Sequence, residues 1–406
     1  MQRLFRLATT GARAGQYAIL FVSLYQSAIT ILGYRKYLQT KGEKPEPPDE
    51  LPHFGLLVCA RNEEAVIANV VNDLQRQDYP ADRRDLIVVA HNCTDDTASV
   101  AARAGARVLD HYTDGPGKAH AIEAGRVALG PDHDFIGVFD ADTRIPPGLL
   151  TQIAAYSRGR ECLQAETIPI ADHEWLAEGY GFGRKARNLF WWRPREALGL
   201  STTITGSGWF IRPEILAKYA TGSWTLTEDL ELSARLVADG HTITYVSSAQ
   251  IACGETRSLQ ASMNQRSRWV RGHIHVVMGR WMPLVRAALL GDWRALDLAM
   301  YLVVPTRVLT RVGVTGGAVL GLIVPAFRLP GLLVWSALAG EWIAPAYIGW
   351  RERLVHLSSG SLRVAMSNSL LSLLWFPIGI WAMGTARLRA WHAMPRVLDR
   401  ETHHVS

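Results

Sequence analysis

The chain contains few charged residues for its length. Of its 406 residues, only 20% are Asp, Glu, Lys or Arg, whereas 48% are hydrophobic. Soluble domains usually carry about 25% charged residues, so this shortage predicts that part of the chain lies in lipid. Cysteine is also sparse. The four cysteines form no Cys-x-x-Cys pair and have no histidine at zinc-ligand spacing, which argues against a disulfide framework or a zinc ribbon and favours free cytosolic thiols.

Two kinds of phosphate-binding pattern are missing as well. No basic run interleaved with aromatic residues occurs outside the apolar segments, so nucleic acid is not an expected partner. The segment Asp114–His120 ("DGPGKAH") offers glycines and Lys118 at a helix start, but it lacks the spacing of a Walker loop. A P-loop ATPase is therefore disfavoured. The net charge of +6 suits contact with anionic lipid headgroups and an anionic substrate.

Long apolar runs stand at both ends of the chain. Ala14–Tyr34 has no charge and is long enough, as a helix, to cross a hydrocarbon core of about 30 Å. Val364–Ala386 is a second uncharged run, interrupted by Pro377, which membrane helices tolerate. Val312–Phe327 and Leu329–Trp350 are further expected spans, although Arg328 and Glu341 interrupt them.

The charges that flank these runs bear on orientation. The first run lacks an Ala-x-Ala site and exceeds a usual signal-peptide core, so we expect an uncleaved anchor. Basic residues weakly favour a cytoplasmic side after this span. One span before and three after would place the C-terminus outside, but Arg387, Arg389, Arg396 and Arg400 prefer the inside, so the span number stays open. We expect a multi-pass plasma-membrane protein with a cytoplasmic catalytic domain.

Between the apolar ends, short strand patterns alternate with helix patterns. Expected strands are 54–60, 85–92, 106–111 and 134–142, and expected helices are 63–77, 95–105 and 117–130. This alternation predicts an α/β fold with a mostly parallel sheet covered by helices on both faces, plus α-helical transmembrane segments. Expected regions are an anchor and flank at 1–45, a catalytic domain at 46–259, Trp- and Arg-rich helices at 260–296, and a membrane region of about three spans at 297–406. The 260–296 helices lie either at the membrane interface or in a buried core.

Polar residues follow the expected strands, where parallel sheets bind ligands. Asp140 and Asp142 flank one small residue after a strand, an arrangement that suits Mg²⁺ or Mn²⁺ but also fits a plain Asx turn. Further along, Glu228 and Asp229 begin a helix pattern, and the Thr225–Glu228 spacing also fits a capping box.

A last motif lies in Gln265–His273 ("QRSRWVRGH"). On a helix, Gln265, Arg268 and Trp269 share one face, which places a guanidinium for a diphosphate beside an aromatic plate for a sugar. A membrane-interface anchor of Arg and Trp is the plainer alternative.

The order of these motifs, Asp-x-Asp, Thr-Glu-Asp and Gln-x-x-Arg-Trp with membrane spans around them, resembles the processive branch of the family-2 inverting glycosyltransferases. That branch includes the cellulose, chitin and hyaluronan synthases and the nodulation chitooligosaccharide synthases. The resemblance covers about residues 55–273 and implies a GT-A fold, a UDP-sugar donor and a divalent metal, Mg²⁺ or Mn²⁺.

The resemblance also implies roles for individual residues. Asp229 would be the general base supported by Glu228, and Asp142 would hold the metal with Asp140. The nucleotide-sugar pocket would comprise Ala60, Arg61, Asn62, Glu63, His91, Asn92, Asp95, Lys118, Asp140 and Ala141. The acceptor and diphosphate side would comprise Gly206, Ser207, Gly208, Trp209, Gln265, Arg266, Arg268 and Trp269. Many relatives carry an acidic residue where His91 stands, so here His91 or Asn92 must accept the hydrogen bond from the nucleobase.

Three functions follow from this pattern. The first is a processive synthase that extends a polysaccharide or oligosaccharide. The second is a transferase that adds one sugar to a lipid such as ceramide or diacylglycerol, since related ceramide glucosyltransferases carry a comparable motif. The third is a catalytically silent scaffold, which the filled catalytic positions disfavour. About four spans leave only a narrow channel for a polymer, unless homo-oligomers complete it.

Overall fold

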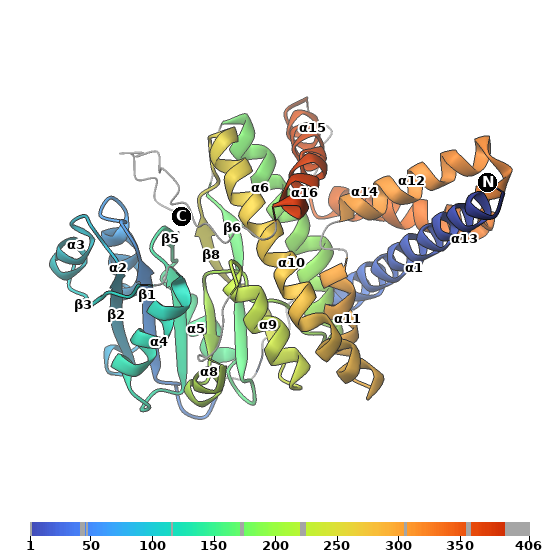
Figure 1. The fold of residues 1–406 in the computed structure, drawn as a ribbon. Coiled ribbons are helices and arrows are strands. Elements are labelled where there is room, and N and C mark those ends of the chain that lie inside the picture. The colour runs from blue at the N-terminus through green and yellow to red at the C-terminus, as the bar shows by residue number, and fades with distance from the viewer. Residues whose placement is uncertain are drawn as a thin grey trace.

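The structure is a computed structural model that describes residues 2–40, 45, 48–114, 117–170, 174–219, 225–303, 307–354 and 359–385. The C-terminal arginines and part of the Asp114–His120 loop lie outside these residues. An α/β unit with a central sheet occupies one side of the molecule, and an arm of apolar helices projects from the other (Figure 1).

The central sheet has eight strands in the order β3-β2-β1-β4-β7-β6-β8-β5. The strands are β1 (Phe54–Ala60), β2 (Arg84–His91), β3 (Arg107–His111), β4 (Phe135–Asp140), β5 (Thr143–Arg144), β6 (Cys162–Pro169), β7 (Trp209–Ile211) and β8 (Ile243–Cys253). Strands β1 to β4 pair in parallel, as do β6 and β8, whereas β7 runs antiparallel to β4 and β6, and β5 runs antiparallel to β8. The sheet is thus mixed, where the sequence predicts a mostly parallel one. The three residues of β7 are too short to leave a periodic pattern.

Helices cover both faces of this sheet. They are α2 (Ile67–Gln75), α3 (Thr97–Arg103), α4 (Lys118–Leu129), α5 (Leu149–Ala155), α6 (Trp175–Arg187), α7 (Arg193–Leu198), α8 (Pro213–Tyr219) and α9 (Glu228–Ala238), with the short helical turns η1 (Ala81–Arg83) and η2 (Asn188–Trp192). In β1, Leu56 and Val58 face one apolar cluster and Leu57 faces the other. This burial on both faces explains why β1 carries no polar side chain. The strands and helices expected between residues 54 and 142 are confirmed, with ends shifted by a few residues.

Two long helices follow β8. They are α10 (Leu259–Leu289) and α11 (Trp293–Val303). One side of α10 is buried, at Val276 and Leu284, whereas Met278 and Leu289 are about four-fifths exposed. One helix face joins the core, as the buried-core alternative predicts. The other face presents exposed apolar side chains, and a place at the membrane interface stays a prediction.

The arm contains α1 (Gln2–Thr40), α12 (Arg307–Ile323), η3 (Pro325–Phe327), α13 (Gly331–Leu338), η4 (Ala339–Ile343) and α14 (Ala344–Arg351), followed by α15 (Ser359–Leu373) and α16 (Trp375–Gly384). α1 lies alongside α12 and α13, with the N-terminus at the tip (Figure 1).

Among the described residues, two helical segments are long and apolar enough to cross a membrane, Thr9–Thr40 and Gly331–Arg351. They contain or overlap two of the expected spans. The expected span Val312–Phe327 corresponds to a shorter apolar helix, Thr310–Ile323. The described part of Val364–Ala386 is not one continuous helix, because α15 ends at Leu373 and α16 begins at Trp375, close to Pro377.

A buried ion pair fastens the arm to the α/β unit. Arg195 of α7 donates two hydrogen bonds, of 2.7 and 2.9 Å, to Asp297 of α11, and both side chains are at most 2% exposed. From α1, the Gln26 amide oxygen accepts a hydrogen bond from Arg195, and the Tyr25 hydroxyl donates one to Asp297. Three helices distant in sequence thus share one buried polar network.

We predict that Asp297→Ala destabilises the protein by about 3–5 kcal/mol, because it leaves the Arg195 guanidinium buried without its carboxylate. Chemical denaturation of the detergent-solubilised protein measures this loss. Lys218→Ala is the control. It removes an exposed ion pair with Asp239 at 3.3 Å and should cost no more than about 1 kcal/mol. Equal losses in the two variants would contradict the anchoring role.

Candidate active site

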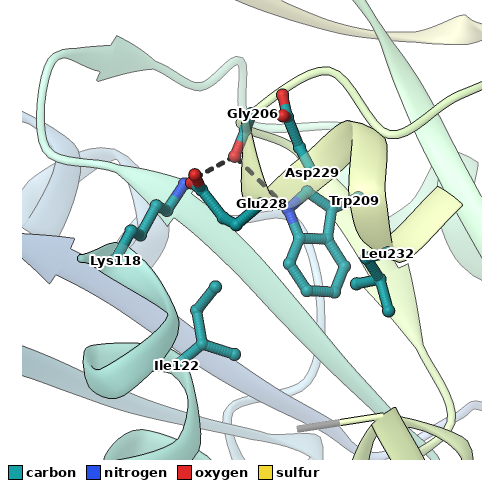
Figure 2. Close-up of a pocket in the computed structure, with 7 residues that line it drawn as sticks. All are labelled: Lys118, Ile122, Gly206, Trp209, Glu228, Asp229 and Leu232. Carbon is teal, nitrogen blue, oxygen red and sulfur yellow. Dashed lines mark hydrogen bonds between the residues drawn. The ribbon is translucent and has the colours of Figure 1, made fainter. Parts of the chain in front are cut away.

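Lys118 stands at the centre of a narrow pocket beyond the end of β4. As the first residue of α4, it donates hydrogen bonds to Asp140 Oδ1 at 2.6 Å and to the Gly206 carbonyl at 2.5 Å. The Trp209 indole N–H donates to the same carbonyl at 3.3 Å (Figure 2). Ile122, Leu232, Glu228 and Asp229 complete the lining. The structure therefore brings residues from four separated segments to one place.

The loop before β7 requires glycine where it approaches the carboxylates. Gly206 has a φ of +83°, and a Cβ there would lie 3.5 Å from Asp140 Oδ2 and 3.8 Å from Asp229 Oδ2. One oxygen of each carboxylate thus faces the same point. Gly208 has a φ of +70°, and a Cβ there would lie 2.5 Å from Ile251. The two glycines let the backbone pass between the carboxylates and the sheet.

Ser207 holds the turn that carries the Asp-x-Asp motif. Its hydroxyl accepts a hydrogen bond from the Asp140 backbone N–H at 3.0 Å and lies 2.7 Å from the Thr143 hydroxyl. Gln164, which is fully buried, donates to the Ser207 carbonyl and accepts from the Thr205 N–H. The Ser207 hydroxyl is therefore engaged with the Asp140–Thr143 turn.

Glu228 and Asp229 occupy the first turn of α9. The expected capping box between Thr225 and Glu228 is wrong. The helix N-cap is Thr227, no side chain caps it, and the Thr225 N–H instead donates to Glu231 at 2.8 Å. Glu231 is buried, and its other carboxylate oxygen accepts a 2.8 Å hydrogen bond from Arg280 of α10. This clamp leaves the carboxylates of Glu228 and Asp229 available to the pocket (Figure 2).

Burial, together with neighbouring charges, shifts the pKa values of this pair. Burial and the charge of Asp229 raise the pKa of Glu228 to about 7, although Lys118 and Arg268 oppose the rise. Burial also raises the pKa of Asp229. Burial alone would lower the pKa of Lys118, but the charge of Asp140 outweighs it, and this pKa lies above its usual value. The pocket therefore holds a permanent cation beside two carboxyls whose pKa values are both raised, that of Glu228 to about 7.

Helix α10 delivers Arg268 to this pair. Gly272, one turn further along, packs so closely on Thr227 that a Cβ there would lie 2.6 Å from the threonine side chain. Gln265 and Trp269 are half-buried on the same helix. The buried guanidinium of Arg266 is 3.8 Å from the Tyr180 ring centroid and 5.8 Å from that of Trp269, and it donates to Ser262. Arg266 thus packs α10 against α6.

Most polar side chains of the expected nucleotide pocket hold its loops. Asn62 exchanges hydrogen bonds with Thr94, and Asp95 accepts from Thr97 and from the Glu64 N–H. Asn92 uses both ends of its amide on the Thr113 backbone, at 3.0 Å each. The left-handed φ values of Asn62 (57°) and Asn92 (52°) mark two tight turns at strand ends. Cys93 donates to the Ala60 carbonyl, and Ala141 is buried.

His91 differs from these neighbours. This residue is 4% exposed, and its ring stacks on the rings of His111 and His120, at centroid distances of 5.4 and 6.2 Å. Within the described part of the chain, neither ring nitrogen makes a hydrogen bond of good geometry. Burial, then the charges of His111 and His120, lowers the pKa of His91, so the ring is neutral at pH 7.

The donor set at Asp140 and Asp142 fits a hard divalent cation. Both residues offer carboxylate oxygens from one turn, which Mg²⁺ and Mn²⁺ prefer as ligands. Asp140 is already paired with Lys118 through Oδ1, and its Oδ2 faces the loop at Gly206. Asp142 acts electrostatically on Arg184 and Cys253, which places it on the side of β8.

Sequence reasoning missed the residues that hold this site together. Gln164, Glu231 and Arg280 organise the loops, and Ile122 and Leu232 form the apolar wall of the pocket. Gln164 sits within a strand, and the other four lie on helices, outside any motif. Only the lone charge of Glu231 on a largely apolar helix face could have attracted attention.

The fold and site define a group-transfer enzyme with a GT-A-like α/β domain. Residues 52–272, more than half of the chain, match the family model described as "Glycosyltransferase like family 2", and the chain belongs to this family of enzymes. It is 27% identical over 274 residues to a beta-monoglucosyldiacylglycerol synthase of Synechocystis sp., covering 62% of this chain and 54% of that one. A protein of the same name from Nostoc sp. is 26% identical, covering 67% and 60%. The chain thus spans a little over half the length of these relatives.

A solved structure shares the fold. It is the mannosyltransferase PcManGT from Pyrobaculum calidifontis in complex with GDP-Man and Mn²⁺, with a TM-score of 0.52, 17% identity, and coverage of 86% of this chain and 98% of that one. These relatives are glycosyltransferases. None of those described here is a cellulose, chitin or hyaluronan synthase.

The raised pKa of the Glu228–Asp229 pair predicts opposite pH trends for activity and stability. We expect kcat/KM to fall as the pH drops below about 7, because the carboxyls take up a proton. Stability should change the other way. A carboxyl whose folded pKa lies above its unfolded value stabilises the fold most at low pH, so unfolding becomes easier as the pH rises from 4.5 to about 7. Pre-steady-state rates and thermal midpoints across this range test both trends.

Glu228→Gln provides the matched variant. It removes one of the two coupled carboxyls, so the acid limb of the rate profile should move to lower pH and the stability slope should flatten. An unchanged acid limb in this variant would show that the limb belongs to another group.

Proposed function

We propose that the protein is an inverting glycosyltransferase that moves one sugar from a UDP-sugar to the hydroxyl of a lipid at the cytoplasmic face of the plasma membrane. The observation that carries this proposal is the convergence of Asp229 and Asp140 on Gly206, next to Lys118. A base and a cation for the leaving group stand at one point, as a single displacement requires.

In the proposed step, the acceptor oxygen attacks the anomeric carbon while its proton passes to Asp229. The bond from that carbon to the diphosphate breaks on the opposite face, so the configuration inverts. Lys118 and Arg268 provide positive charge for the departing diphosphate, and burial raises the pKa of the base Asp229. A divalent ion held by Asp140 and Asp142 would add Lewis-acid stabilisation of the diphosphate.

His91 is the proposed reader of the nucleobase. The sequence leaves His91 and Asn92 as alternatives, but both ends of the Asn92 amide are used on Thr113. A neutral His91 has one lone pair and one N–H in the ring plane, and can therefore accept a hydrogen bond from the base edge. Its buried, unsatisfied nitrogens favour a ligand that completes their hydrogen bonds.

Two observations favour a lipid over a growing polymer as the acceptor. The relatives above are named as synthases of a glucosylated diacylglycerol. The apolar arm and the exposed apolar face of α10 also allow the pocket to lie close to a bilayer. A processive synthase uses the same catalytic residues and remains the second candidate.

We predict that Asp229→Asn lowers kcat by about a hundred to ten-thousand-fold, because a positioned base contributes this much to proton transfer. UDP binding should survive in this variant. Purified membranes are assayed with UDP-glucose, UDP-N-acetylglucosamine, UDP-galactose, UDP-glucuronate and GDP-mannose, following nucleoside diphosphate release and product size together.

Asp142→Ala is the companion variant. It should lose metal-dependent nucleotide binding as well as turnover. A single-sugar lipid product supports the proposal, and a ladder of products supports the processive synthase. Wild-type turnover in Asp229→Asn would refute the mechanism, and no release with any donor would favour the scaffold.

We predict that His91→Phe, which keeps an aromatic ring in the stack, raises the KM for the preferred donor about two- to tenfold with little change in kcat, since a net hydrogen bond contributes about 0.5–1.5 kcal/mol. Initial rates at varied donor concentration measure the split. His111→Phe, which alters the stack next to it, is the control and should leave KM unchanged. If both variants behave alike, His91 packs the site and does not read the base.

A further inference from the structure

Three metal-binding side chains meet at the amino ends of the parallel strands, at the opposite end of the sheet from the catalytic pocket. His53 directly precedes β1, Asp85 is the second residue of β2, and His133 lies two residues before β4. Because β1 pairs with both β2 and β4, the starts of these strands lie side by side. The Nε2 atoms of both histidines reach the same oxygen, Asp85 Oδ2, at 3.1 and 3.0 Å.

These distances fit a single shared ion. One ligand atom from each residue lies within 4.8 Å of the other two. Ligands bound tetrahedrally to Zn²⁺ at about 2.0–2.1 Å stand roughly 3.3 Å apart, close to the observed separations. The side chain of His133 is 4% exposed and that of Asp85 61% exposed. One side of the cluster is therefore open, where water can supply a fourth ligand.

Both ring nitrogens of His53 face hydrogen-bond acceptors, which a neutral imidazole cannot satisfy together. Its Nδ1 lies 3.1 Å from the Asp132 carbonyl oxygen, and its Nε2 lies 3.1 Å from Asp85. Both neighbours are acceptors, so a neutral ring with one N–H can satisfy only one of them. If Nδ1–H donates to the carbonyl, the Nε2 lone pair faces a carboxylate, and a cation between them removes the repulsion. Backbone carbonyls commonly orient metal-bound histidines in this way.

The surrounding backbone is shaped for this cluster. The His53 N–H donates to the Asp134 carboxylate at 2.8 Å, and its carbonyl accepts from the Asp134 N–H at 2.9 Å. Gly55 pairs in register with Asp85, and a Cβ at Gly55 would lie 3.2 Å from the His133 ring. The absence of a side chain at Gly55 leaves room for that ring to approach Asp85.

We propose that His53, Asp85 and His133 bind one Zn²⁺ ion, separate from the Mg²⁺ or Mn²⁺ of the catalytic site. Imidazole nitrogens favour Zn²⁺ over those harder ions. The bound ion links the starts of the three strands whose far ends carry the catalytic and nucleotide residues. Its role is to hold the frame of the site, and it takes no part in sugar transfer.

Calorimetry on the full-length, detergent-solubilised protein tests this proposal. The protein is freed of metal by chelation, carries no histidine tag, and has His403→Ala and His404→Ala so that these adjacent histidines do not bind. Zn²⁺ is titrated in excess Mg²⁺. We expect one site per chain, and Zn²⁺ should raise the thermal midpoint. His53→Ala should weaken the affinity by at least about tenfold, the lower bound for losing even an outer-shell partner.

His241→Ala is the matched control. It removes another histidine–carboxylate pair, with Glu161 at 2.8 Å, and should leave Zn²⁺ affinity unchanged. Asp85→Asn keeps the size of the side chain and should alter the visible spectrum of the Co²⁺-substituted protein. Midpoints without metal show whether each variant folds. If the parent binds no Zn²⁺, or if His53→Ala and His241→Ala bind alike, Asp85 only accepts hydrogen bonds and the proposal fails.

Discussion

The active site depends on the positive charge of the Lys118 ammonium group. This group stands among the carboxylates of Asp140, Glu228 and Asp229, which would repel one another without it. Holding several negative charges in a partly buried place requires fixed positive charge nearby. Lys118 supplies it from the start of α4, and Arg268 supplies more from α10. Gly206 lies where the backbone approaches the carboxylates of Asp140 and Asp229, and Gly272 lies where α10 packs on Thr227 at the start of α9.

The same logic extends to the contacts that position the catalytic helix. α9 is held from behind by the buried Glu231, which binds both the Thr225 backbone and Arg280. α10 thereby supports the carboxylates with one face and presents exposed methionines and leucines with another. In the proposed lipid transferase, α10 extends from the apolar surface that the lipid acceptor approaches to Asp229, which takes the acceptor's proton. The Arg195–Asp297 network fixes the apolar arm to the same assembly.

The strands of the parallel half of the sheet carry polar clusters at both ends. Their carboxyl ends carry His91, Asp140 and the loops around Asn62 and Asn92, whereas their amino ends gather His53, Asp85 and His133. A rigid strand transmits its position from one end to the other, because both faces are packed in apolar clusters. An ion at the amino end would therefore stabilise the geometry at the carboxyl end without touching the substrate.

The sequence by itself determined the local elements between residues 54 and 142, the position of the Asp-x-Asp turn, and the helix that starts at Glu228. These follow from apolar periodicity and strand-end chemistry, which depend only on neighbouring residues. Tertiary structure alone decided the antiparallel β7, the clamp from Arg280 to Glu231, the packing of Arg266 on Tyr180, and the meeting of His53 with His133. Such contacts join segments tens of residues apart, and their partners are set by packing, which leaves no periodic trace in the chain.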